Sequence, residues 1–150
     1  MDLKIKALSP KIGADIPVPS YATAGSAGMD LRACIDAPVT ILPGEQSLVP
    51  TGLAIALPSA DYVALLYARS GLAIKHGLSP ANCVGVIDSD YRGEIVVALR
   101  NYAKEPYTVE PGERIAQMVI TPVVQAAIAL VDELDDTDRG AGGFGSTGRV

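Results

Sequence analysis

Five stretches of the sequence combine polar or charged residues with glycine in a way that suits phosphate chemistry. They are SAGMDLRA (26–33), ARSGLAIKHGL (68–78), NCVGVIDSDYRGEI (82–95), GERIAQM (112–118) and RGAGGFGSTG (139–148). In the second, Arg69 and Ser70 precede a short predicted helix. A guanidinium, a hydroxyl and free backbone N–H groups are thereby placed at one point, which suits phosphate. Taken alone, this stretch is explained equally well by an ordinary helix cap beside a surface arginine.

The third stretch carries the residue best suited to activate a water molecule. Asp88 follows Val86 and Ile87 in an apolar run, so we expect partly apolar surroundings for its carboxylate. A carboxylate held within reach of a water can act as a general base. The alternative is a turn in which Asp88, Asp90 and Gly93 serve local hydrogen bonds. The pattern favours a function for Asp88, and less so for Asp90.

The other three stretches are weak signals when each is taken alone. Asp30 in the first is compatible with a turn that enters a strand, and Arg114 and Gln117 in the fourth with surface or interface polar groups. The last stretch lacks the Gly-Lys-Ser/Thr pattern and the flanking strand and helix of a P-loop. It does hold the only phenylalanine of the chain, Phe144. A loop that closes over a nucleotide can stack such a ring on the base and turn its glycine N–H groups to the phosphates.

Histidine and cysteine are too scarce for several kinds of site. His76 is the only histidine, and Cys34 and Cys83 are the only cysteines. A histidine-rich metal site is therefore excluded, and a Ser-His-Asp or Cys-His arrangement would have to use His76. The ligand set of a zinc deaminase is also missing, since no CxxC occurs. Two cysteines make no disulfide framework and predict a reducing, cytoplasmic location.

Charge and hydropathy narrow the expected partners. The net charge of −5 is accounted for by five acidic residues between positions 132 and 138, and the rest of the chain is balanced. Without a basic patch, duplex nucleic acid is not an expected partner. The longest apolar runs, 63–68 and 95–99, are too short to cross a bilayer, and residues 1–10 do not resemble a signal peptide, so no membrane is expected either.

The elements that must position these residues are predicted to be β-strands. The chain has 150 residues with 15 glycines and 11 prolines, and turn signals recur between short apolar stretches, as in a single all-β domain. The candidate strands are 3–8, 39–42, 48–57, 62–68, 94–101 and 114–124. One short helix is predicted, with Ser70 as N-cap and Gly77 closing it. Residues 124–134 fit a strand or a helix, and the surrounding β pattern favours a strand.

Taken together and in this order, the five stretches resemble the five motifs of the trimeric dUTPase family, over essentially the whole chain. The resemblance implies an all-β subunit with a jelly-roll-like or distorted β-barrel (β-clip) fold and at most one short helix. It also implies a homotrimer whose sites are shared between subunits. Such an assembly fits the candidate strands that are apolar on both faces, because these strands need partner subunits to cover them. Residues 1–138 would form the β domain, and residues 139–150 a mobile glycine-rich arm that closes over a neighbouring active site.

The resemblance also implies an activity. Members of this family hydrolyse dUTP to dUMP and diphosphate by Mg²⁺-assisted attack of water at the α-phosphorus, which keeps uracil out of DNA and supplies dUMP for dTMP synthesis. Asp88 matches the aspartate that activates the water. Asp30 matches the aspartate that meets the metal through water, the Mg²⁺ being held mainly by the triphosphate.

Further positions match the substrate-binding residues of the family. Tyr91 matches the tyrosine that supports the deoxyribose and leaves no room for a 2′-hydroxyl, and Asn82 matches a residue that reads the uracil edge. The others matched are Gly85 and Val86 beside the uracil, Arg69, Ser70, Gly71 and Gln117 as phosphate holders, and Arg139, Phe144, Gly145, Ser146 and Thr147 in the closing arm.

Three other functions remain open at this point. A dCTP deaminase, or a bifunctional deaminase and dUTPase, shares this fold, but Tyr91 and the Phe144 arm argue against it. A non-catalytic dUTPase-like binding protein would not need Asp88. A structural β trimer with a disordered tail would need none of the five motifs.

Overall fold

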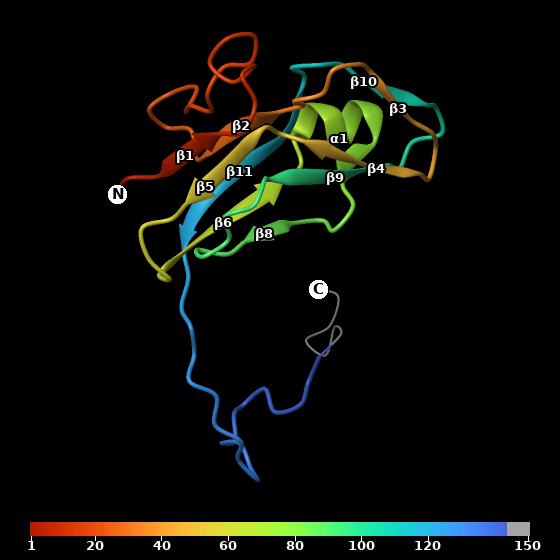
Figure 1. The fold of residues 1–150 in the computed structure, drawn as a ribbon. Helices are drawn as coiled ribbons and strands as arrows, with labels where there is room; N and C mark the ends of the chain where they lie inside the picture. Colours follow the sequence, from red (N-terminus) through yellow and green to blue (C-terminus); the bar gives the residue numbers. More distant parts are fainter. Residues whose placement is uncertain (144–150) are drawn as a thin grey trace.

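The computed structural model describes residues 1–143, which form a body of antiparallel strands with one short helix (Figure 1). In chain order the elements are β1 (Lys4–Ala7), β2 (Gly28–Arg32), β3 (Val39–Ile41), β4 (Gln46–Pro50), β5 (Leu53–Ala56), β6 (Tyr62–Tyr67), α1 (Ser70–His76), β7 (Leu78–Pro80), β8 (Gly85–Ile87), β9 (Val96–Asn101), β10 (Tyr107–Val109) and β11 (Arg114–Pro122). The expected all-β class with a single short helix is confirmed.

Two sheets and two strand pairs enclose the core. The larger sheet has the order β2-β11-β6-β8, the smaller one β4-β9-β7, and the pairs β1-β5 and β3-β10 complete the body. Buried side chains from both sheets, among them Leu31, Val49, Leu99 and Met118, form one apolar cluster. Helix α1 lies beside β7 and adds Leu72 to that cluster. The strands thus form a distorted barrel around one core.

The single strand expected over residues 48–57 is wrong, because β4 and β5 are separate strands. The break falls at Gly52, whose φ of +70° lies in the left-handed region that favours glycine. Two hydrogen bonds that involve side chains join residues 51 and 52, at this break, to residues 94 and 95, which directly precede β9. The Gly52 N–H donates to Glu94 Oε1 over 2.8 Å, and the Thr51 hydroxyl donates to the Ile95 carbonyl over 2.6 Å. The break therefore anchors the end of the loop that holds Asp88 and Tyr91.

The expected helix is present, but its predicted N-cap is wrong. Arg69 occupies the cap position with extended φ and ψ of −84° and 129°, and Ser70 is already the first helical residue. The Arg69 side chain makes no capping bond, because a guanidinium has no acceptor for the free N–H groups of the helix. It donates instead to Asp30 on β2. The predicted end is confirmed, since Gly77 adopts a φ of +64° and its N–H donates to the Ala73 carbonyl.

Four strands were not predicted: β2, β7, β8 and β10. Each has five residues or fewer, and alternation over so few residues is a weak signal. These short strands exist because they pair with neighbouring strands, as β8 pairs with β6 at the edge of the larger sheet.

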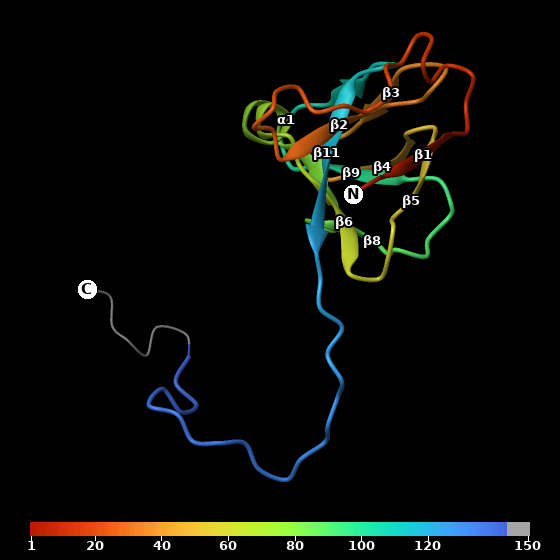
Figure 2. The same ribbon diagram turned by 90° about the vertical axis from the view of Figure 1, so that its left-hand side faces the viewer.

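The strand favoured for residues 124–134 is absent. Residues 123–143 leave the end of β11 and run away from the body as an extended arm, as Figures 1 and 2 show from two sides. Ile128 and Leu130 are 98% and 100% exposed. In the described residues, the Val123 N–H is the last backbone group of the arm to bond the body, at the Asp61 carbonyl. A strand needs a neighbour to satisfy its backbone groups, and a single chain offers none here.

Gly52→Ala is predicted to destabilise the fold more than Gly44→Ala. Both glycines have positive φ, which costs an L-residue about 1–2 kcal/mol. A Cβ at Gly44 meets nothing within 4 Å, whereas one at Gly52 would lie 2.7 Å from Cys34 Sγ. Overpacking of this kind adds about 1–3 kcal/mol. Urea unfolding of both variants checks the difference, and equal losses would contradict the steric argument.

Candidate active site

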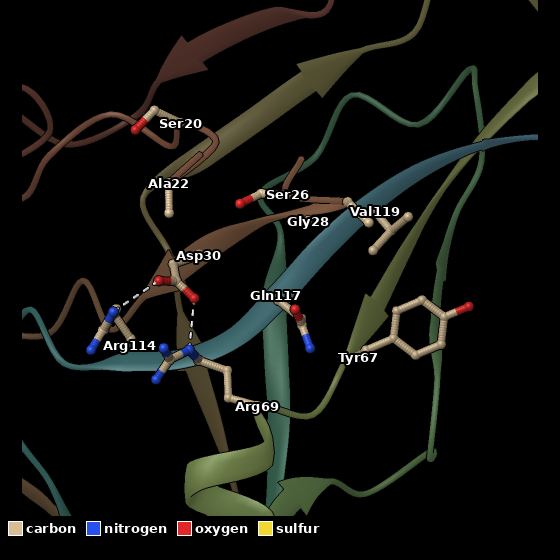
Figure 3. Close-up of a pocket in the computed structure, with 11 residues that line it drawn as sticks. Ser20, Ala22, Ser26, Gly28, Asp30, Tyr67, Arg69, Arg114, Gln117 and Val119 are labelled. Atoms are coloured by element: carbon tan, nitrogen blue, oxygen red, sulfur yellow. Dashed lines mark hydrogen bonds and ion pairs between the residues drawn. The ribbon is translucent and has the colours of Figure 1, made fainter. Parts of the chain in front are cut away.

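One hollow gathers expected site residues from three strands and the start of α1. Asp30 on β2 pairs with Gln117 on β11, which in turn pairs with Tyr67 on β6, so the three side chains share one face of the sheet. Arg69 follows β6 and Arg114 begins β11. We call the space of about 540 Å³ between them the arginine hollow; it is lined by Asp30, Arg69, Arg114 and Gln117, with Tyr67 and Gly28 at its side (Figure 3).

The carboxylate of Asp30 holds both guanidinium groups of the arginine hollow. Arg69 Nε donates to Asp30 Oδ1 over 2.6 Å, and Arg114 Nη1 donates to Asp30 Oδ2 over 3.2 Å (Figure 3). The Asp30 and Arg69 side chains are about one third and one quarter exposed, so this pair is partly shielded from water. Two positive charges against one negative charge leave the hollow with a net positive charge. Oriented guanidinium groups of this kind suit phosphate oxygens.

Gln117 is held in the same hollow by the backbone. Its Nε2 donates to the Ala68 carbonyl over 2.9 Å, just before Arg69. Gly28 makes room for this side chain, because a Cβ there would lie 3.2 Å from Gln117 Oε1. The structure thus brings together three expected site residues, Asp30, Arg69 and Gln117, from three distant stretches of sequence.

Arg114 was not among the expected site residues. It lies in the same short motif as Gln117, and that proximity was the only signal in the sequence. Its position is fixed by the turn before β11, where Tyr107 donates a hydrogen bond to Glu113 over 2.5 Å. Burial, followed by this hydrogen bond, raises the pKa of Tyr107 to about 12, so the phenol is neutral and remains a donor across the physiological range.

Ser70 and Gly71 lie beside the arginine hollow as the first two residues of α1. Both are exposed, and no atom from elsewhere in the described chain lies within 4 Å of where a Gly71 Cβ would be. Arg69 and Gly71 line a shallow hollow together with Lys75 and Arg114. The second motif therefore presents its hydroxyl and backbone groups to open space next to two guanidinium groups.

Asp88 lies in a different hollow, which we call the Asp88 hollow. This space of about 560 Å³ is lined by Asp88 to Asp90 together with Tyr62, Val63, Val86 and Val123, and it shares no residue with the arginine hollow. The partly apolar surroundings expected for Asp88 are present, but the residue itself is exposed. Val63 and Tyr67 point to the same face of β6 four residues apart, which separates the two hollows by about 13 Å along the strand.

A third, smaller hollow adjoins the Asp88 hollow. It measures about 110 Å³ and is lined by Asn82, Gly85 and Val86 together with Leu66 and residues 96–98. Val86 lines both hollows, so they are neighbours. Gly85 is buried, and a Cβ there would lie 3.0 Å from Leu66 Cβ, so a side chain at this position would crowd Leu66, which also lines the hollow.

Tyr91 lines none of these hollows, and its ring lies against the loop formed by residues 88–94. The backbone closes the loop, with the Tyr91 N–H donating to the Asp88 carbonyl over 3.2 Å. Arg92 Nη1 donates to the carbonyls of Ser89 and Tyr91, both over 2.8 Å. Tyr91 Oη donates to the Glu94 carbonyl over 3.1 Å, and the residue is 44% exposed. The loop is therefore closed by its own hydrogen bonds.

The second half of the fifth motif, from Phe144 on, lies outside the described residues. Arg139 is described, in a turn of the arm where its Nε donates to the Gly142 carbonyl over 2.9 Å. Phe144, Gly145, Ser146 and Thr147 fall beyond residue 143, so their expected positions are not placed.

Within residues 1–143, no three histidine, cysteine, aspartate or glutamate side chains come together as metal ligands would. In the same part of the chain, no helix is long and apolar enough to span a membrane.

Comparisons with known proteins identify the family of the chain. The sequence model of the dUTPase family matches residues 14–148. The deoxyuridine 5′-triphosphate nucleotidohydrolase of Serratia proteamaculans is 55% identical over 98% of this chain and 97% of its own, and that of Hahella chejuensis is 56% identical over 97% and 96%. Among solved structures, a mutant of the Staphylococcus bacteriophage 80alpha dUTPase with dUpNHpp is 27% identical over 98% of each chain and has a TM-score of 0.85. The chain belongs to the dUTPase family.

Proposed function

We propose that this member of the dUTPase family hydrolyses dUTP to dUMP and diphosphate, with a water activated by Asp88 attacking the α-phosphorus. The observation that carries the proposal is the arginine hollow, where Asp30 orients two guanidinium groups beside Gln117. A net positive, preformed hollow on a chain of net charge −5 favours a polyanionic ligand such as a triphosphate. Removal of dUTP keeps uracil out of DNA, and its product supplies dTMP synthesis.

The spacing of the hollows supports a site shared between copies of the chain. About 13 Å of β6 separates the arginine hollow from the Asp88 hollow. The face between them carries half-buried Leu65 and Val119 and the 60% exposed Val86, three apolar side chains that are neighbours on adjacent strands. A second copy that covers this face would bring its Asp88 to the arginine hollow of the first. We therefore propose a homotrimer in which each site draws on more than one subunit.

Asp88 is proposed as the general base because of where it lies. It is an exposed carboxylate at the end of β8, and neither Arg69 nor Arg114 is paired with it, so it is free to accept a proton from water. Attack by water needs no covalent nucleophile, which suits a chain with a single histidine. Arg69, Ser70, Gly71 and Gln117 are proposed to hold the phosphates in line with that water.

The arginine hollow is compatible with a Mg²⁺ ion that is held mainly by the substrate phosphates. Mg²⁺ keeps several waters and is usually bound by one or two carboxylates together with substrate phosphates. Both Asp30 oxygens are bonded to arginines, so Asp30 would meet a hydrated ion through water while it keeps the guanidinium groups in place. When bound with the substrate, Mg²⁺ neutralises charge on the triphosphate. The chain's own residues orient the phosphates.

Base and sugar recognition are proposed for the neighbouring hollow and loop. The small hollow beside Asp88 is lined by Asn82, Gly85 and Val86 and would hold the uracil ring, with Asn82 and the strand backbone reading its edge. Tyr91 would support the deoxyribose and exclude a 2′-hydroxyl. Arg139, Phe144, Gly145, Ser146 and Thr147 are proposed to close over the nucleotide from a neighbouring subunit. Residues 123–143 extend away from the body as an arm (Figure 1).

Asp88→Asn is predicted to lower turnover of dUTP by roughly 10²–10⁴-fold, the usual contribution of a general base. Binding of a non-hydrolysable dUTP analogue should stay close to that of the parent, because the amide keeps the shape of the carboxylate. Asp90→Asn removes the same charge from the same hollow and is expected to lower turnover less than tenfold. Steady-state kinetics and calorimetry measure both effects. Equal losses in the two variants would contradict the assignment of Asp88.

Deletion of residues 139–150 is predicted to spare folding and assembly and to remove most of the activity. The body and its core end at β11, so thermal unfolding and the number of subunits in the assembly should not change. Loss of the stacking ring alone removes about 1–3 kcal/mol of nucleotide binding. A chain that lacks only residues 149 and 150 is the control, since it keeps the whole motif. Full activity in the longer deletion would mean that the arm has no catalytic role.

A further inference from the structure

The Tyr91 ring lies directly over the backbone of Gly93. A Cβ built on Gly93 would lie 2.6 Å from Tyr91 Cζ and 3.0 Å from Cε2, and closer still to Oη. These separations are well inside van der Waals contact. With the ring where it is, position 93 accepts only a residue that has no side chain.

This requirement is steric and not conformational. Six other glycines of the described chain have positive φ, the region that disfavours residues with a Cβ, and Gly93 is not one of them. Alanine can therefore adopt the backbone of Gly93 without strain. Apart from the two adjacent residues, the three atoms nearest to a Cβ at this position all belong to the Tyr91 side chain.

The ring is the part that would give way. Tyr91 is 44% exposed, and its Oη makes a single hydrogen bond, to the Glu94 carbonyl. The loop backbone is held far more firmly, by the two Arg92 bonds to carbonyls and by the Glu94 carboxylate on the Gly52 N–H. A methyl group at position 93 would swing the ring off the loop and leave the backbone in place.

We propose that Gly93 is a specificity-determining residue that acts through Tyr91. Because Gly93 has no side chain, the Tyr91 ring can lie against the loop backbone. The hydrogen bond from Tyr91 Oη to the Glu94 carbonyl then holds the ring where it would contact the sugar. The inference rests on the proposed role of Tyr91 in excluding the 2′-hydroxyl. Gly93 itself is a positioning residue and does not touch the substrate in this account.

The test compares Gly93→Ala, Tyr91→Ala and the double variant with the parent, using kcat/KM for dUTP and for UTP. Gly25→Ala is the control for a general glycine effect, since a Cβ there meets nothing within 4 Å and its φ is not positive. Gly93→Ala is expected to lower the dUTP/UTP ratio by roughly tenfold or more, the scale at which a pocket discriminates small groups by shape. Its unfolding temperature should stay at or slightly above the parent value.

The double variant separates action through the ring from a general distortion of the loop. If Gly93 acts only on the ring, the dUTP/UTP ratio of the double variant matches that of Tyr91→Ala within about twofold. The two changes are then coupled, because without the ring a methyl group at position 93 has nothing to displace. An unchanged ratio in Gly93→Ala, with a lowered ratio in Tyr91→Ala, would overturn the role of Gly93 while the role of Tyr91 stands. An unchanged ratio in Tyr91→Ala would instead overturn the proposed function of that residue. A dUTP/UTP ratio much lower in the double variant than in Tyr91→Ala would show that Gly93 shapes the backbone. That result would also overturn the inference.

Discussion

Strand β6 keeps the two chemical centres of this chain apart. Its outer face carries Tyr67 at the arginine hollow and Val63 at the Asp88 hollow, and an extended strand cannot bring residues four positions apart any closer. The same strand lies in the middle of the larger sheet, between β11 and β8, so its position is fixed by pairing on both sides. A single chain therefore holds its oriented guanidinium groups and its free carboxylate at a fixed separation. The apolar face between them and the extended arm are the features that a second copy of the chain would use.

Each half of the proposed site is held in place by its own local contacts. In the arginine hollow, one carboxylate holds two guanidinium groups, and the register of β2 with β11 sets Gln117 beside them. Around Asp88, the loop is closed by Arg92 and tied to the body through Glu94 and Gly52. Glycines at positions 28, 85 and 93 leave space that neighbouring side chains or a ligand can occupy. Preorganised donors of this kind stabilise charge as it develops in a reaction without a cost of reorganisation.

The sequence predicted the fold class and the family better than it predicted the geometry. Turn residues between short apolar runs indicate an all-β body, and Gly77 marks the end of the helix, because these are local preferences. The break at Gly52 and the role of Arg69 at the helix start depend on contacts with Glu94 and Asp30, which are distant in sequence. Arg114 was missed as a site residue for the same reason. The strand expected over 124–134 failed because a strand needs a partner, and one chain supplies none there.

The most direct test of the account is complementation between two inactive variants. Asp88→Asn and Arg69→Ala chains are unfolded, mixed in equal amounts and refolded, with mass spectrometry confirming mixed trimers. If Asp88 and Arg69 of one site come from different subunits, about one site in four carries both native residues after random mixing, and dUTP turnover returns to a corresponding fraction of the parent value. If both residues of a site came from the same chain, every site would lack one of them. Mixed trimers as inactive as the separate variants would therefore contradict the shared site.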